Sequence, residues 1–238
     1  MNEKIKKLEE IIKESNNIVF LGGAGVSTES GLKDFRGQGG IYKQKYEYPA
    51  ETILSHNFFF EHNEKFYDFY FKEMVNLNVK PNYAHYFLAD LEDKGKLKAI
   101  ITQNIDGLHQ KAGSKKVLEL HGSVLDNYCC KCNQYYSLNE YKNFRICPKC
   151  KGLIKPDVVL YQEPLKEQTI KESIQFIQNA EVLIVGGTSL NVFPANQLIY
   201  YFRGKYLILI NQEKTNFDQF FNLVINEKIG EVFKQIKL

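Results

Sequence analysis

Short apolar runs alternate along the chain with stretches in which apolar residues recur at helical spacing. Six runs have the length and composition of buried parallel strands, at residues 18–21, 98–102, 117–120, 181–186, 205–210 and 223–225. The intervening stretches 4–16, 82–93 and 165–180 are typical of helices that lie on a sheet, as shown by Ile5, Leu8 and Ile12 in the first. Strands that alternate with helices predict an α/β fold with a Rossmann-like, doubly wound parallel sheet.

The first strand runs directly into a glycine-rich turn. Gly22, Gly23 and Gly25 are followed by Ser27 and Thr28. Glycines let the backbone approach a diphosphate, and free N–H groups at a helix start point at the anion. Because threonine stands where the pattern G-x-G-x-x-G has its third glycine, an ordinary strand-to-helix turn stays open as an alternative.

Polar residues also follow the next strands. Gln103, Asn104 and Asp106 come after the second strand, and His121 follows the third, directly before a glycine. The carboxyl ends of parallel strands are where open α/β sheets bind ligands. Imidazole is the usual base near neutral pH, so His121 is a candidate catalytic residue. The alternatives are capped turns for the first group and a structural role for the histidine.

Residues 57–75 are crowded with aromatic side chains at helical spacing. Such residues usually pack into a core, so we predict a helical insertion that packs beside the main sheet. His85, on the apolar face of the helix that follows, is predicted to be structural.

Cysteine spacing gives the strongest chemical signal. Cys129 and Cys132 form one C-x-x-C pair, Cys147 and Cys150 form another, and 14 residues separate the pairs. Four thiolates at this spacing predict a closed, structural zinc site, and Cys130 remains as a free thiol.

Bulk properties narrow the class of protein. The net charge of +3 is too small to indicate a nucleic-acid or membrane partner. The hydrophobic content of 44% is typical of a globular protein. The first residues lack the apolar region of a signal peptide, and no apolar stretch approaches the roughly 18 residues of a membrane span. We therefore expect a cytoplasmic protein without a nucleic-acid or membrane partner.

The motifs, taken in order, resemble the sirtuins, which are NAD-dependent protein deacylases, and the layout looks most like the compact bacterial type. The resemblance is carried by residues 23–27, 30–36, 102–106, 121–122, the four cysteines, 187–190 and 194–195. It implies one catalytic domain over residues 1–238. Its NAD-binding part would comprise about 1–38, 80–125 and 153–238, its helical insertion about 39–79 and its zinc module about 126–152.

The resemblance also implies roles for individual residues. NAD would be the co-substrate, one zinc ion would be structural, and acetylated or otherwise acylated lysines in protein substrates would be the partner. The acyl group would pass to ADP-ribose, releasing nicotinamide and O-acyl-ADP-ribose, with His121 as general base. NAD would contact Gly23, Ala24, Gly25, Thr28, Phe35, Arg36, Gln103, Asn104, Ile105, Asp106, His121, Gly187, Thr188, Ser189, Asn211, Gln212 and Ile229. The acyl-lysine tunnel would be bordered by Val158, Val159 and Tyr161, and zinc would be held by Cys129, Cys132, Cys147 and Cys150.

The chain departs from the sirtuin pattern in three places. Lys33 stands where the family usually has proline, and Tyr161-Gln162-Glu163 replaces the usual Phe-Gly-Glu. The Tyr-x-x-Arg pair of the desuccinylase-type members is matched by residues 67–70, which contain no arginine. The last departure predicts that the acyl group is uncharged.

Two other functions remain open from the sequence. A mono-ADP-ribosyltransferase would use the same NAD site with a protein nucleophile as acceptor. A zinc-ribbon protein that binds nucleic acid or a partner would use the lysines and tyrosines around the four cysteines, but would leave the glycine turn and His121 without a purpose.

Overall fold

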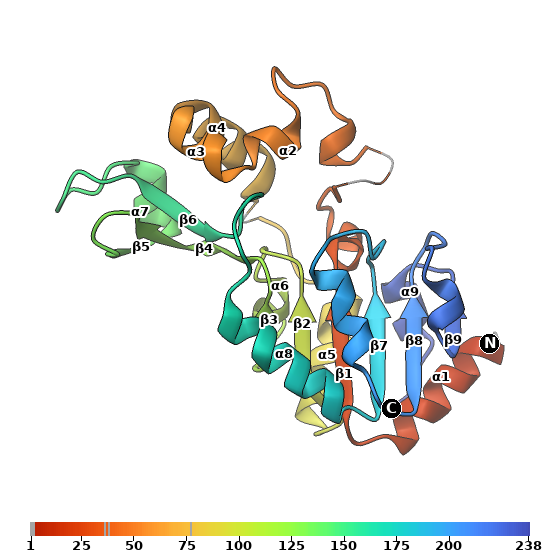
Figure 1. Ribbon diagram of the computed structural model, residues 1–238. Helices are drawn as coiled ribbons and strands as arrows, with labels where there is room; N and C mark the ends of the chain where they lie inside the picture. The colour runs from red at the N-terminus through yellow and green to blue at the C-terminus, as the bar shows by residue number, and fades with distance from the viewer. Residues whose placement is uncertain (1–2, 36, 38, 77) are drawn as a thin grey trace.

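A six-stranded parallel sheet forms the centre of the molecule (Figure 1). The computed structural model describes residues 3–35, 37, 39–76 and 78–238. The strand order is β3-β2-β1-β7-β8-β9, and every neighbouring pair is parallel. The strands are β1 (Ile18–Gly22), β2 (Leu97–Thr102), β3 (Val117–Glu119), β7 (Val182–Gly186), β8 (Tyr206–Ile210) and β9 (Leu223–Ile225). The predicted doubly wound sheet is confirmed.

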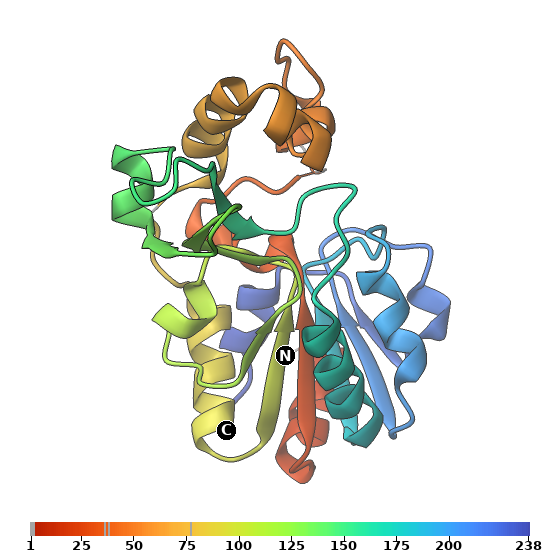
Figure 2. The same ribbon diagram turned by 60° about the vertical axis from the view of Figure 1, so that its left-hand side comes forward.

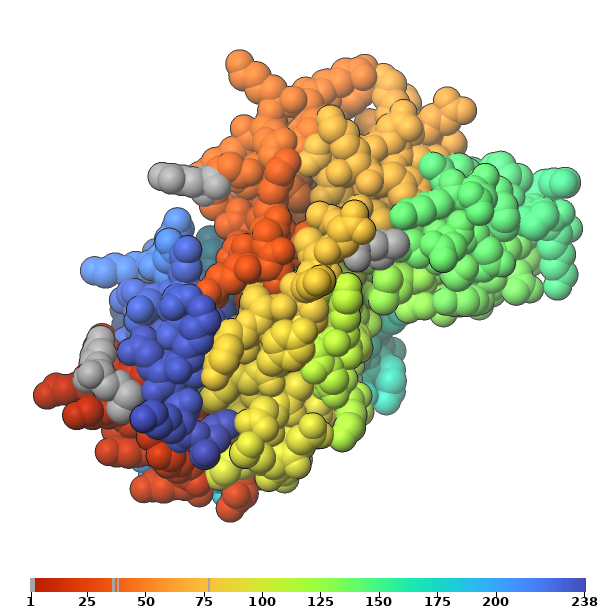
Figure 3. Space-filling view, turned by 180° about the vertical axis from the view of Figure 1, so that it is seen from behind, coloured from red at the N-terminus to blue at the C-terminus, as the bar shows by residue number. Residues whose placement is uncertain are grey.

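Helices cover both faces of this sheet. Helices α1 (Glu3–Glu14), α5 (Tyr83–Asp93) and α9 (Ile229–Lys234) cover one face, while α8 (Glu167–Asn179) and the 3-10 helix η5 (Ala195–Tyr201) cover the other (Figure 1). In Figure 3, seen from behind, α5 and α9 lie side by side, and their Phe87 and Phe233 rings stack 4.4 Å apart. The short helix α6 (Leu108–Lys111) follows β2.

Alternate residues of each strand face opposite layers. Phe20 packs in the core under α1, α5 and α9, whereas its neighbour Leu21 packs in the core under α8 and η5. Both side chains are fully buried. Burial on both faces explains why the strands appear in the sequence as continuous apolar runs rather than alternating ones.

A second, smaller sheet was not predicted. Strands β4 (Gly122–Cys129), β5 (Tyr135–Ser137) and β6 (Ile154–Val158) pair antiparallel in the order β5-β4-β6, with helix α7 (Leu138–Asn143) beside them. The apolar run 158–160 begins at the last residue of β6 and therefore at the small sheet, not at the main one. The alternating burial of Ile154, Pro156 and Val158 is the period-2 pattern of a half-buried strand.

The helical insertion lies beyond the carboxyl ends of the parallel strands (Figures 1 and 2). It contains η3 (Ile41–Lys43), α2 (Ala50–Ile53), α3 (His56–Glu61), α4 (Asn63–Phe69) and η4 (Tyr70–Met74), the last being one π-helical turn. Its aromatic residues form a core with the small sheet, in which Phe59, Phe66 and Tyr70 are fully buried. The prediction that these aromatics pack as core is confirmed, with Phe60 as an exposed exception.

Within the described residues, no helix combines the length and the apolar character that crossing a membrane requires.

Candidate functional site

A cavity of about 640 Å³ lies where the parallel strands end and the helical insertion begins. Its walls come from the segments that follow β1, β2, β3, β7 and β8, from the loop that precedes the insertion, and from residues 158–165. This volume is typical of a small-molecule site. The polar residues at the strand ends therefore surround one space.

Nearly all the residues predicted to contact NAD or acyl-lysine line this cavity. They are Ala24, Gly25, Thr28, Phe35, Gln103, Asn104, Ile105, Asp106, His121, Val158, Val159, Tyr161, Gly187, Thr188, Ser189, Asn211, Gln212 and Ile229. Gly23 lies behind the wall, against Thr188. Arg36 lies outside the described residues.

The glycine turn packs against the loop that follows β7. The Gly25 N–H donates to the Gly187 carbonyl at 2.8 Å, and a Cβ on Gly25 would lie only 2.8 Å from Gly187 Cα. The turn itself consists of two 3-10 turns, η1 (Ala24–Val26) and η2 (Thr28–Ser30), rather than the expected start of an α-helix. Close contact between the two loops is thus one reason for the glycines, beside the predicted approach to a diphosphate.

His121 is held in one tautomer at the cavity wall. Its Nδ1 lies 2.8 Å from the Gln103 carbonyl oxygen, which can only accept, so Nδ1 carries the proton and Nε2 keeps its lone pair. Burial lowers the pKa of His121, and the hydrogen bond to Gln103 offsets this in part. The next residue, Gly122, has φ +75°, and a Cβ there would lie 1.7 Å from the Asp157 carbonyl oxygen, so the turn that presents His121 requires glycine.

Asp106 is fixed by a buried hydrogen-bond chain. Ser27 Oγ donates to Asp106 Oδ2 at 2.7 Å and accepts from Asn104 Nδ2 at 3.1 Å, while the Leu108 N–H donates to Asp106 Oδ1. Burial raises the pKa of the Asp106 carboxyl, and the hydrogen bonds from Leu108 and Ser27 lower it in part. Asp106 therefore presents a positioned acceptor at the base of the cavity.

A buried histidine pair lies behind this chain. The Asn82 N–H donates to His85 Nδ1, so His85 Nε2 carries the proton and faces Ser27 Oγ at 3.5 Å. The rings of His85 and His109 lie 4.8 Å apart, and neither ring nitrogen of His109 has a partner among the described residues. Burial lowers the pKa of His85 to about 4 and that of His109 to about 3.

The four predicted zinc ligands gather at one point of the small sheet. The sulfur atoms of Cys129, Cys132, Cys147 and Cys150 all lie within 4.8 Å of one another. A tetrahedral zinc with bonds of about 2.3 Å needs sulfur atoms about 3.8 Å apart. The Cys132–Cys147 pair lies at 3.7 Å, and the Cys129–Cys150 pair is closer, at 3.3 Å. Four thiolates leave no open position, so the donor set fits a structural ion. Cys130 is exposed and lies outside the cluster.

Comparison with known proteins identifies the family. The model of the Sir2 family matches residues 23–194. The chain belongs to the Sir2 family.

Curated relatives and solved structures of the Sir2 family align with almost the whole length of this chain. NAD-dependent protein deacetylases of Clostridium tetani and Clostridium perfringens are each 54% identical, covering 95% and 99% of this chain and 94% and 99% of their own lengths. A Sir2 structure with a deacetylated p53 peptide and 3'-O-acetyl ADP ribose has a TM-score of 0.91 at 38% identity, covering 97% of this chain and 96% of that one. A structure of Sir2Tm bound to a propionylated peptide has a TM-score of 0.88 at 37% identity, covering 98% and 96%.

Several residues of this Sir2-family site had no contact at the site assigned to them from the sequence. Ser27 lies at the end of the glycine turn, yet its link to Asp106 spans 79 positions and has no local signal. Tyr42 lines the cavity from the insertion, where it appears in the sequence as one aromatic residue among many. Lys33, a departure from the sirtuin pattern, also lines the cavity and pairs with Glu73 at 3.2 Å.

Proposed function

We propose that this Sir2-family chain is an NAD-dependent protein-lysine deacetylase that passes the acyl group from lysine to ADP-ribose, with release of nicotinamide and O-acyl-ADP-ribose. The names of its relatives support the activity, and the homologous structure with 3'-O-acetyl ADP ribose supports the product. One observation of this chain carries the assignment. A neutral imidazole of fixed tautomer lies on the same cavity as the paired glycine loops.

His121 acts as general base toward the ribose. Its Nδ1 proton is engaged by Gln103, so Nε2 is the atom that accepts a proton from a ribose hydroxyl. The base must be neutral, and the lowered pKa keeps it neutral to lower pH than an exposed histidine. Activity therefore falls on the acid side of the His121 pKa and stays level above it.

The NAD-binding wall divides into two parts. Ala24, Gly25 and Thr28 line the diphosphate region, and the residues after β7 and β8 hold the adenosine half, namely Gly187, Thr188, Ser189, Asn211 and Gln212, with Ile229 from α9 beside them. When bound, NAD supplies the electrophilic ribose carbon. Asp106 and Ile105 would hold the nicotinamide carboxamide, Gln103 and Asn104 would contact the adjacent ribose, and Phe35 would shield that ribose from water.

The acyl-lysine enters beside Val158, Val159 and Tyr161. Backbone groups of this segment pair with the substrate peptide as an added strand. Homologous structures contain acetylated and propionylated peptides. The acyl group is uncharged, because residues 67–70, at the positions of the family's acid-binding pair, contain no arginine. Tyr67 and Tyr70 are buried in the insertion core and are not among the residues that line the cavity.

Cys129, Cys132, Cys147 and Cys150 would hold a zinc ion that ties the small sheet together and that has no open position for a substrate. When bound, it supplies folding free energy to a segment with little apolar core of its own. Reduced thiolates are required for this, so we assign the protein to the reducing cytoplasm.

The test measures NAD-dependent turnover of an acetyl-lysine peptide and uses mass spectrometry to detect the O-acetyl-ADP-ribose that forms. We expect His121→Ala to lower turnover by about a thousandfold while NAD still binds, since general base catalysis contributes about 10²–10⁴-fold. The matched control, His62→Ala, removes an exposed histidine and should leave turnover unchanged. Transfer of labelled ADP-ribose to protein without O-acetyl-ADP-ribose would instead show a mono-ADP-ribosyltransferase.

A further inference from the structure

Residues 159–164, here named the strap, form the wall of the cavity that faces the helical insertion. The strap runs from the end of β6 to α8, and Val159, Tyr161 and Gln162 all line the cavity. It is joined to the insertion by two backbone hydrogen bonds. The Tyr161 N–H donates to the Leu54 carbonyl and the His56 N–H donates to the Tyr161 carbonyl, each at 2.9 Å.

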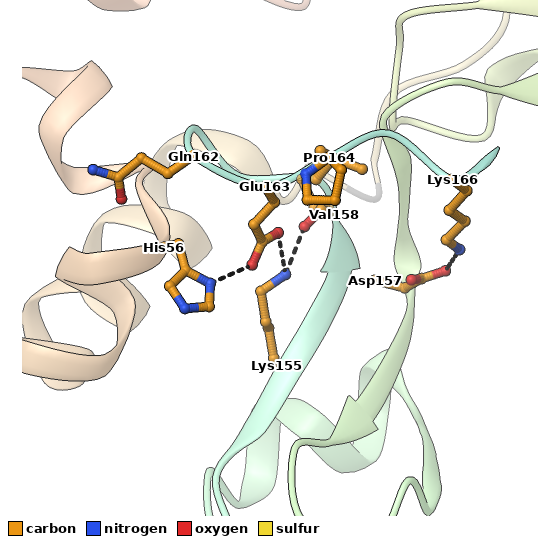
Figure 4. Close-up of a pocket in the computed structure, with 9 residues that line it drawn as sticks. His56, Lys155, Asp157, Val158, Gln162, Glu163, Pro164 and Lys166 are labelled. Carbon is orange, nitrogen blue, oxygen red and sulfur yellow. Dashed lines mark hydrogen bonds and ion pairs between the residues drawn. The ribbon is translucent and has the colours of Figure 1, made fainter. Parts of the chain in front are cut away.

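Three side-chain contacts add to this connection. The hydroxyls of Tyr161 and Tyr42 lie 2.6 Å apart, the Asn57 N–H donates to Gln162 Oε1 at 3.1 Å, and His56 Nδ1 donates to Glu163 Oε1 at 2.9 Å. Figure 4 shows the outer side of the strap, where Glu163 bonds to His56 on one side and to Lys155 of β6 on the other. The first two contacts depend on the chain's departures from the Phe-Gly-Glu pattern, because phenylalanine has no hydroxyl and glycine has no side chain.

The backbone of Gln162 supports a role for its side chain. Its φ of +74° lies in the left-handed region, which costs a residue with a Cβ about 1 kcal/mol or more. Such a conformation persists only where neighbouring groups hold it in place. The Gln162 side chain is held by its hydrogen bond from the Asn57 N–H at the start of α3.

Tyr42 connects the strap to the opposite wall. Its N–H donates to the Phe35 carbonyl at 3.0 Å, and the two rings lie 5.3 Å apart. The Tyr42–Tyr161 hydroxyl pair therefore joins the strap to the loop that carries Phe35, across the space that both tyrosines line.

We propose that the Tyr42–Tyr161 hydroxyl pair and the Gln162–Asn57 hydrogen bond set the width of the acyl-lysine channel and thereby restrict this enzyme to short acyl groups. The proposal rests on the proposed deacylase function. A longer acyl chain has to move the strap away from the insertion, which carries both Tyr42 and Asn57, and this movement breaks both contacts. Each contact opposes the longer substrate by about fivefold, which corresponds to one side-chain hydrogen bond.

The test compares peptides of one sequence that carry acetyl-, butyryl- or octanoyl-lysine, at saturating NAD. We expect the wild-type enzyme to prefer acetyl. The ratio of octanoyl to acetyl kcat/KM should rise about fivefold in Tyr161→Phe, about fivefold in Gln162→Gly and more than tenfold in the double variant. Tyr200→Phe removes a hydroxyl from an exposed residue of η5 outside the cavity lining, and should leave the ratio unchanged.

Amide hydrogen exchange gives a second readout that does not depend on turnover. The Tyr161 and His56 amides should exchange faster in the double variant than in wild type, while amides of β7 keep their rates. A double variant with native circular dichroism and an unchanged acyl ratio would overturn the proposal, as would a wild-type enzyme that prefers octanoyl. A wild-type enzyme that cleaves none of the three peptides would instead overturn the proposed function, and this proposal with it.

Discussion

The two walls of the cavity are built differently. The wall assigned to NAD consists of loops at the ends of buried parallel strands, joined by backbone contacts such as Gly25 to Gly187. The wall assigned to acyl-lysine consists of the strap, which two backbone hydrogen bonds of Tyr161 join to the insertion. The remaining contacts that hold it depend on side chains of the strap, the insertion and β6. We therefore expect an added side-chain atom to disrupt the NAD wall, and the loss of a side-chain hydrogen bond to let the strap shift.

The two walls also differ in the burial and charge of their titratable side chains. Behind the NAD wall, His85 and His109 are fully buried and their low pKa values hold them neutral. In the strap, Glu163 is partly exposed and charged. Burial acts to raise its pKa, but hydrogen bonds from His56 and Leu160 and the charge of Lys155 lower it overall. The histidines behind the NAD wall are thus buried and uncharged, whereas the strap carries a charged and partly exposed group.

The largest expected effect concerns the pH dependence of stability behind the NAD wall. Both histidines have folded-state pKa values far below the usual 6.5, so the unfolded chain binds more protons between these values. Stability is therefore complete above about pH 7 and is lost as pH falls. At pH 5 the loss is about 2 kcal/mol for each histidine, or about 4 kcal/mol for the pair. Urea unfolding at pH 8 and pH 5 measures it.

Single variants isolate this contribution from other acid-sensitive groups, the zinc ligands included. His109→Leu should halve the histidine contribution, since it leaves only His85 to titrate. His62→Gln, at an exposed position, should give the wild-type pH dependence. Identical pH dependence in His109→Leu and wild type would show that the buried pair does not control it.

The second effect tests the rigidity of the NAD wall. In Gly25→Ala, the added Cβ would lie 2.8 Å from Gly187 Cα, so the two loops must separate. A displacement of about 1 Å at a reacting centre can cost about a hundredfold, and we expect a loss of this size in kcat/KM for NAD. Gly95→Ala is the control for backbone strain without a clash at the site. Its φ of +71° strains an alanine, so stability should fall, but its Cβ would meet nothing within 4 Å and Gly95 does not line the cavity, so kcat/KM should keep its wild-type value. Near-normal activity in Gly25→Ala would remove the contrast between the walls.

The smallest effect tests the strap. Glu163→Gln keeps the shape of the side chain but weakens its bonds to Lys155, His56 and the Leu160 N–H. We expect KM for the acetyl-lysine peptide to rise about tenfold, which corresponds to one charge-assisted hydrogen bond, while KM for NAD changes less than twofold. Steady-state kinetics with each substrate varied in turn measures both. If KM for the peptide and KM for NAD changed equally, the strap would affect NAD binding as much as peptide binding.

The sequence predicted the NAD wall better than the acyl-lysine wall. Apolar runs such as 18–21 and 181–186 indicate buried parallel strands, and the carboxyl ends of such strands lie at one edge of the sheet, so the polar residues that follow them meet. The C-x-x-C pairs were equally informative, because their spacing alone brings four sulfur atoms together.

The strap could not be predicted for a physical reason. Its position depends on contacts between residues far apart in the chain, such as Tyr42 with Tyr161, which lie 119 positions apart. No local periodicity marks such a pair. The antiparallel small sheet was missed because β6 contains Pro156, and its pairing with β4 spans the whole cysteine segment.

General base catalysis by His121 requires NAD to lie across the strand ends with its nicotinamide ribose beside the imidazole. A crystal structure of the protein with NAD and an acetyl-lysine peptide tests this most directly. We predict the diphosphate against Gly25 and a ribose hydroxyl within hydrogen-bond reach, about 3 Å, of His121 Nε2. A ribose held far from His121, or NAD bound outside this cavity, would contradict the account.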